Sequence, residues 1–124
     1  MVRMLHTSDV HIGHVKGPGE HHADVCQCPV LGLAAAVLEH QADVLMISGD
    51  LFDHARLSDI TVGATLEIVA SPGVPVVIIP GNHDVHDTKS LWERCRSDVQ
   101  RTGVHLLDRL EGSSLVLESK GMTF

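Results

Sequence analysis

Three short apolar runs along the chain predict buried β-strands. They occupy residues 2–5, 44–47 and 74–79. Each run is continuous instead of alternating between apolar and polar residues, which is typical of strands covered on both faces in a parallel sheet. Two further strands are predicted near the C-terminal end, over residues 104–107 and 114–118.

The segments between these runs carry apolar residues at helical spacing. The first segment presents one apolar face, made of Val30, Leu33, Ala34, Val37 and Leu38. The second presents a face made of Leu57, Ile60, Ala64 and Ile68. A third, shorter helix is predicted to begin near Thr88 and to turn inward Leu91, Trp92 and Cys95. One helix is therefore expected after each of the first three strands.

The second helix has start and stop signals. Ser58 is a suitable N-cap, because its hydroxyl can accept a hydrogen bond from a backbone N–H of the first turn. Leu57 and Val62 stand at the two positions of a hydrophobic staple around that cap. The sequence Ser71-Pro72-Gly73 is expected to end the helix, because proline cannot continue it.

The predicted order is β-α-β-α-β-α-β-β. Strands that alternate with helices favour right-handed crossovers and an α/β fold with a mainly parallel sheet. The 124 residues fit a single domain, taken as residues 1–124. A long polar loop is predicted over residues 13–27, and loops of that length tend to be functional or mobile.

Composition and charge narrow the classes of function. No apolar run is long enough to span a bilayer, and the N-terminus becomes polar too early for a signal peptide, so a cytoplasmic protein is expected. The formal net charge is −7, with 16 acidic against 9 basic residues and no basic cluster. A protein that binds nucleic acid through its own surface usually carries a basic patch. Any nucleic-acid binding by this chain would therefore have to depend on bound metals, further sequence or a partner.

Three cysteines give an odd count without a framework of spacings: Cys26, Cys28 and Cys95. Cys26 and Cys28 could bind a metal or form a strained bond, but a single such pair is weak evidence for zinc. In a cytosolic chain all three are expected to be reduced thiols.

Residues that ligate metals follow each of the first three apolar runs. In chain order they are Asp9, His11, Asp50, Asn82, His83 and Asp84. Ligands of open α/β sheets bind beyond the carboxyl ends of the strands, where these residues are expected to meet. Oxygen donors combined with imidazole suit Mn, Fe or Zn better than calcium or magnesium. Each carboxylate could instead cap a helix, and Asn82 could make a turn.

These motifs resemble those of the calcineurin-like metallophosphoesterases: Asp-x-His at 9–11, Gly-Asp at 49–50 and Gly-Asn-His-Asp at 81–84. The resemblance covers about residues 1–90 and implies half of a four-layer metallophosphoesterase sandwich. The runs His-Thr-Ser-Asp-x-His at 6–11 and Gly-Asp-Leu-Phe-Asp at 49–53 look most like the DNA-repair exonuclease branch. The implied activity is hydrolysis of phosphoester bonds, with DNA or a nucleotide as substrate.

The resemblance also implies a role for each residue. Asp9 and His11 would hold one divalent ion, with Mn expected and Fe or Zn as alternatives. Asp50 would bridge two ions, and Asn82 would hold the second. His83 would face the substrate as a general acid or transition-state donor, with Asp84 orienting its ring. His14 and His54 lie close to the motifs and are either substrate-binding residues or ordinary loop residues.

The chain departs from the family pattern in one respect. After Asp84 it contains only His86 and His105, and no Gly-His-x-His motif. The second half of the expected sandwich is missing, which leaves three interpretations: a two-metal enzyme, a non-catalytic metal-binding fragment, or an interaction module that self-associates. An open half-sandwich is expected to form a homo-oligomer or to bind a partner that completes it.

Overall fold

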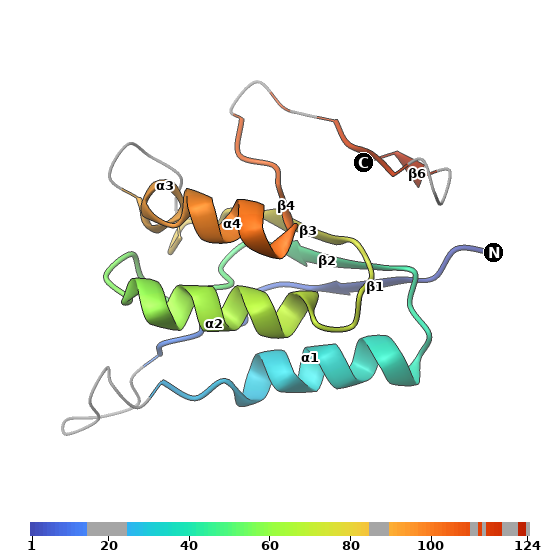
Figure 1. The fold of residues 1–124 in the computed structure, drawn as a ribbon, viewed down its shortest axis with the longest axis horizontal. Coiled ribbons are helices and arrows are strands. Elements are labelled where there is room, and N and C mark those ends of the chain that lie inside the picture. Colours follow the sequence, from blue (N-terminus) through green and yellow to red (C-terminus); the bar gives the residue numbers. More distant parts are fainter. Residues whose placement is uncertain (15–24, 85–89, 110–111, 113, 118–121, 124) are drawn as a thin grey trace.

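The computed structural model describes residues 1–14, 25–84, 90–109, 112, 114–117 and 122–123. Four parallel strands form one sheet in the order β1-β2-β3-β4 (Figure 1). Their bounds are Met4–Thr7, Val44–Ser48, Val76–Ile79 and His105–Leu106. A short antiparallel pair, β5 and β6, follows at Val116–Leu117 and Met122–Thr123. The α/β class and the parallel sheet predicted from the hydrophobic pattern are confirmed.

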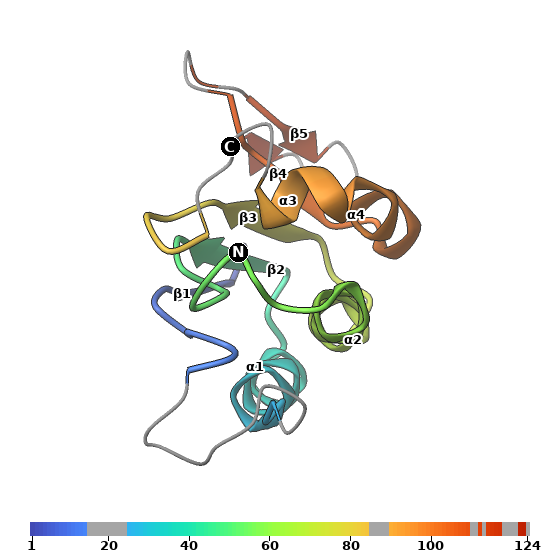
Figure 2. The ribbon, with the colours of Figure 1, turned by 90° about the vertical axis from the view of Figure 1, so that its left-hand side faces the viewer.

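Within the described residues, four helices connect and follow these strands. They are α1 at Cys28–Glu39, α2 at Asp59–Ala70, α3 at Leu91–Arg94 and α4 at Arg96–Thr102. The sheet order follows the chain order, so right-handed crossovers place successive helices on the same face. Figure 2 shows α1, α2 and α4 along one side of the sheet. The carboxyl ends of β1, β2 and β3 are therefore left free to carry loops at one edge.

The buried face of α1 matches the prediction, apart from its end. Val30, Ala34 and Val37 are buried, whereas Leu38 is 64% exposed. Leu38 lies beside the last residue of the helix, Glu39. The apolar stripe therefore leaves the sheet one position earlier than the spacing predicts.

The predicted face of α2 is confirmed only in part. Leu57 is buried in the core and Ile68 packs against it, but the other positions differ. Ile60 is 86% exposed, while Val62, Leu66 and Val69 are completely buried. Thr65 is also buried there, since its hydroxyl donates to the backbone oxygen of Thr61. The helix is apolar nearly all round, so the spacing of apolar residues alone did not determine which side faces the core. The buried hydroxyl of Thr65 is tolerated on that side because the helix backbone accepts its hydrogen bond.

The ends of α2 match the sequence signals. The Ser58 hydroxyl accepts a hydrogen bond of 3.2 Å from the backbone N–H of Thr61. The two staple residues, Leu57 and Val62, are both buried in the main core cluster. The helix ends at Ala70, and Gly73 supplies the left-handed turn after it with φ of 78°.

The third helix and the long loop are only partly described. Leu91, Trp92 and Cys95 are all completely buried, as predicted, and Ser90 caps α3 by accepting from the N–H of Glu93. The predicted start near Thr88 lies outside the described residues. So does most of the loop predicted over 13–27.

The face of the sheet opposite the helices carries a second, smaller apolar cluster. Val44, Val77 and Leu117 are buried in it. Around it, Met4, Ile79 and Val116 remain 48%, 36% and 57% exposed. The prediction of strands covered on both faces therefore holds for the centre of the described sheet and not for β1. Among the described residues, no helix combines the length and hydropathy needed to cross a membrane.

Candidate metal centre

The loops after β1 and β2 run side by side at the carboxyl edge of the sheet. The backbone N–H of Asp9 donates to Gly49 O at 3.1 Å, and that of His11 donates to Asp50 O at 3.0 Å. Asp9, His11 and Asp50 all have φ near 55°, in the left-handed region. Each such residue costs about 1 kcal/mol or more, and non-glycine residues held this way cluster at functional sites. The ligand atoms of these three side chains lie within 4.8 Å of one another.

The His11 ring lies among three carboxylates. Its Nδ1–H donates to Asp53 Oδ1 at 2.8 Å. On the other side of the ring, Nε2 lies 3.6 Å from Asp9 Oδ1 and 3.9 Å from Asp50 Oδ2. With the Nδ1 proton on the Asp53 side, the Nε2 lone pair faces two carboxylates. Ligand atoms at this spacing fit a cation bound at about 2.0–2.2 Å from each, with Asp53 orienting the ring from behind.

The Asn82 amide faces the carboxylate of Asp50. With its NH₂ turned toward Asp50, it donates to Oδ2 at 2.9 Å and to Oδ1 at 3.2 Å. In the opposite amide orientation, the Asn82 oxygen would face the two Asp50 carboxylate oxygens. Three oxygen acceptors placed together in this way are stable only with a cation among them. Asp50 thus has ligand groups on two sides: His11 and Asp9 on one, Asn82 on the other. The donor set fits a divalent metal.

The loop after β3 packs closely on Asp50. A Cβ at Gly81 would collide with the carboxylate and the backbone nitrogen of Asp50. The backbone N–H of His83 donates to Asp50 Oδ1 at 2.9 Å. Behind this contact, the fully buried Asp84 accepts hydrogen bonds from the N–H groups of Gly81 and Phe52. Burial raises the pKa of Asp84 even though both donors lower it. Asp84 therefore ties the loops after β2 and β3 together.

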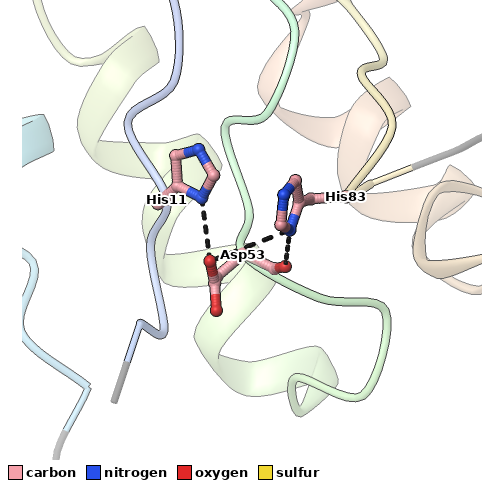
Figure 3. Close-up of side chains that lie close together, drawn as sticks. All are labelled: His11, Asp53 and His83. Atoms are coloured by element: carbon pink, nitrogen blue, oxygen red, sulfur yellow. Dashed lines mark hydrogen bonds and ion pairs between the residues drawn. The ribbon is translucent and has the colours of Figure 1, made fainter. Parts of the chain in front are cut away.

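The His83 ring lies against Asp53 and His11 (Figure 3). Its Nδ1–H donates to the Asp53 carbonyl oxygen at 2.9 Å, and Nδ1 lies 3.9 Å from Asp53 Oδ1. The His11 and His83 rings meet edge to face, with centroids 4.7 Å apart. The resemblance assigned the orienting role to Asp84. In the structure both Asp84 oxygens accept from backbone N–H groups, and the ring is oriented by Asp53 instead.

Asp53 was missed as a site residue by the sequence reasoning. It contacts His11 and His83, and its Oδ1 also lies 3.6 Å from His14 Nδ1. Its signal was present in the run Gly-Asp-Leu-Phe-Asp, which ends on it. Only the pairing of the loops, with the Asp53 N–H donating to Ile12 O at 2.9 Å, brings it behind His11.

The contacts around His11 raise the pKa of the histidine and lower the pKa values of Asp53 and Asp9. The hydrogen bond that His11 donates to Asp53 raises the pKa of His11, although burial works against it. Partial burial alone would raise the pKa of Asp53, but the His11 hydrogen bond and the nearby His14 charge outweigh it and lower the pKa. The Ser8 hydroxyl lowers the pKa of Asp9. The lowered pKa favours the ionised form of Asp9, the form that a metal ligand must have.

The two substrate-binding candidates sit differently. The His14 side chain is 58% exposed and lies at the rim beside Asp53. His54 is half-buried, and its Nδ1 accepts from the backbone N–H of Arg56 at 3.2 Å within its own loop. His14 is thus presented to solvent at the site, while His54 helps to shape the turn that follows Asp53.

The described side chains form two groups that could hold a metal, and they share His11. One consists of Asp9, His11 and Asp50; the other consists of His11, Asp53 and His83. In each group the ligand atoms lie within 4.8 Å of one another. Because Asp53 already binds the Nδ1 side of His11, the first group is the better candidate for the ion.

Comparison with known proteins agrees with this geometry. The sequence profile described as calcineurin-like phosphoesterase matches residues 2–120. The chain is 33% identical over 91 residues to the DNA double-strand break repair protein Mre11 of Methanopyrus kandleri, a match covering 71% of this chain and 20% of that protein. It is 29% identical over 118 residues to the D component of the nuclease SbcCD of Rhodobacter capsulatus, covering 88% and 27%.

A solved structure extends the comparison to the fold. The crystal structure of the Pseudomonas putida nuclease MPE matches with a TM-score of 0.56 at 26% identity, over 94% of this chain and 50% of that one. The four-stranded sheet and its helices therefore correspond to about half of such a structure. The chain spans between 20% and 27% of the length of the two curated relatives above.

Proposed function

This chain belongs to the calcineurin-like phosphoesterase family, and on that premise we propose that it hydrolyses phosphodiester bonds with two divalent metal ions, manganese first among the candidates. The observation that carries the proposal is the His11 ring, whose Nε2 faces Asp9 and Asp50 while Nδ1 donates to Asp53. When bound, the ions would polarise the phosphate and activate a water for attack on phosphorus.

The residues of the chain divide the remaining work. Asp9 and His11 would bind one ion, Asn82 the other, and Asp50 both, because the Asp50 carboxylate lies close to both His11 and Asn82. His83 would donate a proton or a hydrogen bond to the phosphate from Nε2, since Nδ1 is held by the Asp53 carbonyl. Asp84 would act by holding the two metal-binding loops together rather than by touching substrate.

DNA is the substrate class that we favour, with a nucleotide phosphodiester as the alternative. Two relatives are described as a DNA double-strand break repair protein and a component of a nuclease. The site itself is acidic, with Asp9, Asp50 and Asp53 all placed around His11. A phosphodiester anion would be repelled from it until cations invert the local field. Substrate binding is therefore expected to require metal, with His14 at the rim as a further contact.

Replacing His83 with alanine should lower turnover by about a hundredfold, the usual scale for one general acid or donor. The test is manganese-dependent hydrolysis of bis(p-nitrophenyl) phosphate, together with metal content by mass spectrometry. Metal content should stay near that of the parent chain, because His83 is not one of the three ligands in the Asp9–His11–Asp50 group.

The matched control for this variant is His40→Ala. His40 is exposed at the C-cap of α1, near the opposite end of the sheet. It should keep both turnover and metal content. A His83→Ala chain that hydrolyses at the parent rate, or one that loses its metal, would contradict the assigned role.

Self-association through the open sheet face is a second expectation. Met4, the register partner of the buried Val44, is 48% exposed, and Val116, which adjoins the buried Leu117, is 57% exposed. Such apolar faces pair with another surface, and a two-fold dimer would bury the same patch on both copies. Light scattering should show the mass rising toward that of a dimer with concentration. The double variant Met4→Gln, Val116→Gln should weaken this rise.

Ile60→Gln is the control for the association. Ile60 is 86% exposed on the helical side of the molecule, so its removal should leave the mass curve unchanged. A clean monomer at every concentration would rule out self-association. If Ile60→Gln changed the mass curve as much as the Met4→Gln, Val116→Gln double variant, the contact between copies would not lie on the open sheet face.

A further inference from the structure

The start of α1 holds two exposed thiols in contact. The backbone N–H of Cys28 donates to Cys26 Sγ at 3.3 Å, so the Cys26 side chain folds back over the first turn of the helix. Gln27, between them, is the N-cap residue and has φ of −91° and ψ of 6°, a bent backbone just outside the helix. Because this backbone is bent and not extended, the Cα atoms of Cys26 and Cys28 lie about as far apart as residues i and i+2 of a helix, roughly 5.4 Å. Disulfides usually have Cα separations of about 4.4–6.8 Å, so the pair can be bridged.

The helix end favours a thiolate at Cys26. The N-terminus of α1 has no side-chain cap and no acidic residue in its first turn. Its N–H groups and the positive end of the helix dipole are therefore uncompensated. Cys26 Sγ accepts a hydrogen bond from the N–H of the first helical residue, Cys28. The hydrogen bond from the Cys28 thiol and then the Cys28 N–H lower the pKa of Cys26, while the same contact raises the pKa of Cys28.

A metal site explains this pair less well than a redox role. Among the residues that the structure describes, the groups able to hold a metal contain neither Cys26 nor Cys28. A structural zinc needs four ligands, and two thiolates supply only half of them. A disulfide needs no third group. The different pKa values of the two thiols also suit a division of labour between an attacking and a resolving cysteine.

We propose that Cys26 and Cys28 form a reversible dithiol–disulfide pair, oxidised by exchange with a small-molecule disulfide such as that of glutathione. The Cys26 thiolate attacks one sulfur of the small disulfide, forms a mixed disulfide and releases one thiolate. Cys28 then loses its proton to solvent and attacks the Cys26 sulfur, which closes the Cys26–Cys28 bond and releases the second thiolate. Two protein thiols are oxidised and one small disulfide is reduced to two thiols.

The third cysteine serves as an internal control. Cys95 is completely buried, and burial, with Asp59 beside it, raises its pKa to about 11. Both the access and the thiolate that exchange requires are therefore lacking at Cys95. The proposal concerns α1 and does not depend on the phosphoesterase function.

The test exposes the reduced 124-residue chain to oxidised glutathione and follows its intact mass. The expected product is about 2 Da lighter than the reduced chain, with Cys26 and Cys28 protected from iodoacetamide and Cys95 alkylated only after denaturation. The Cys28→Ser variant should stop at the mixed disulfide, about 305 Da heavier. Cys95→Ser should behave like the parent chain. The proposal is overturned if the parent chain keeps a glutathione adduct, if it stays fully reduced, or if Cys28→Ser accumulates no adduct.

Discussion

Replacing Asp50 with alanine should reduce manganese-dependent phosphodiester hydrolysis by at least about a thousandfold, since metal ions contribute several kcal/mol to the transition state and about 1.4 kcal/mol corresponds to tenfold in rate. Asp50 is 5% exposed and lies between two sets of ligands. Its Oδ2 faces His11 Nε2 at 3.9 Å, and its carboxylate also faces the Asn82 amide. One substitution therefore removes a ligand from both proposed ions.

Metal content must fall together with activity in this experiment. Native mass spectrometry should show lower occupancy of both metal ions in Asp50→Ala than in the parent chain. The Asp50→Asn variant separates charge from shape, because its amide oxygen can still accept from the His83 N–H, which donates to Oδ1 at 2.9 Å in the parent. It should fold and still lose metal.

The control for Asp50 is Asp98→Ala on α4. It removes a carboxylate from a surface ion pair with Arg101, and exposed pairs contribute about 1 kcal/mol at most. Metal content and turnover should be unchanged. Parent-level turnover in Asp50→Ala would show that the bridging role is wrong.

Placing alanine at Gly81 should disable the site without removing any ligand. The added Cβ would meet the Asp50 carboxylate and backbone nitrogen, and neither can move freely. Asp50 is held by His83 N–H, and the Asp84 carboxylate fixes the Gly81 N–H. We expect the free energy of unfolding to fall by about 2 kcal/mol, in the range for overpacked sites. Metal affinity should fall further than this loss of stability explains.

Gly32→Ala is the matched control, measured by thermal and denaturant unfolding. Gly32 lies within α1, and a Cβ there would meet nothing within 4 Å. Alanine at this position should raise stability by about 0.5–1 kcal/mol, because it is the better helix former. Metal binding should not change. If Gly81→Ala binds manganese as tightly as the parent, the close packing of the two loops is not what shapes the site.

Several features of this protein are determined by the sequence itself. The three apolar runs locate β1, β2 and β3, and Ser58 and Gly73 mark the ends of α2, because local backbone preferences and caps act over a few residues. The fact that Asp9, His11, Asp50 and Asn82 lie together follows from one rule. Parallel strands end at one edge, so residues just after them are neighbours in space.

Other features were decided only by tertiary contacts. The sequence spacing favoured Ile60 as a core residue of α2, but the structure buries Val62 and Leu66, because an almost wholly apolar helix can turn either side to the sheet. The sequence also could not show that Asp53 lies behind His11. Asp53 and His11 are far apart in the chain, and only the pairing of the loops after β1 and β2 places the carboxylate at 2.8 Å from the ring. Hydrophobic periodicity shows which residues of an element share a face. The partner of a polar side chain depends instead on backbone hydrogen bonds between segments that are distant in the sequence.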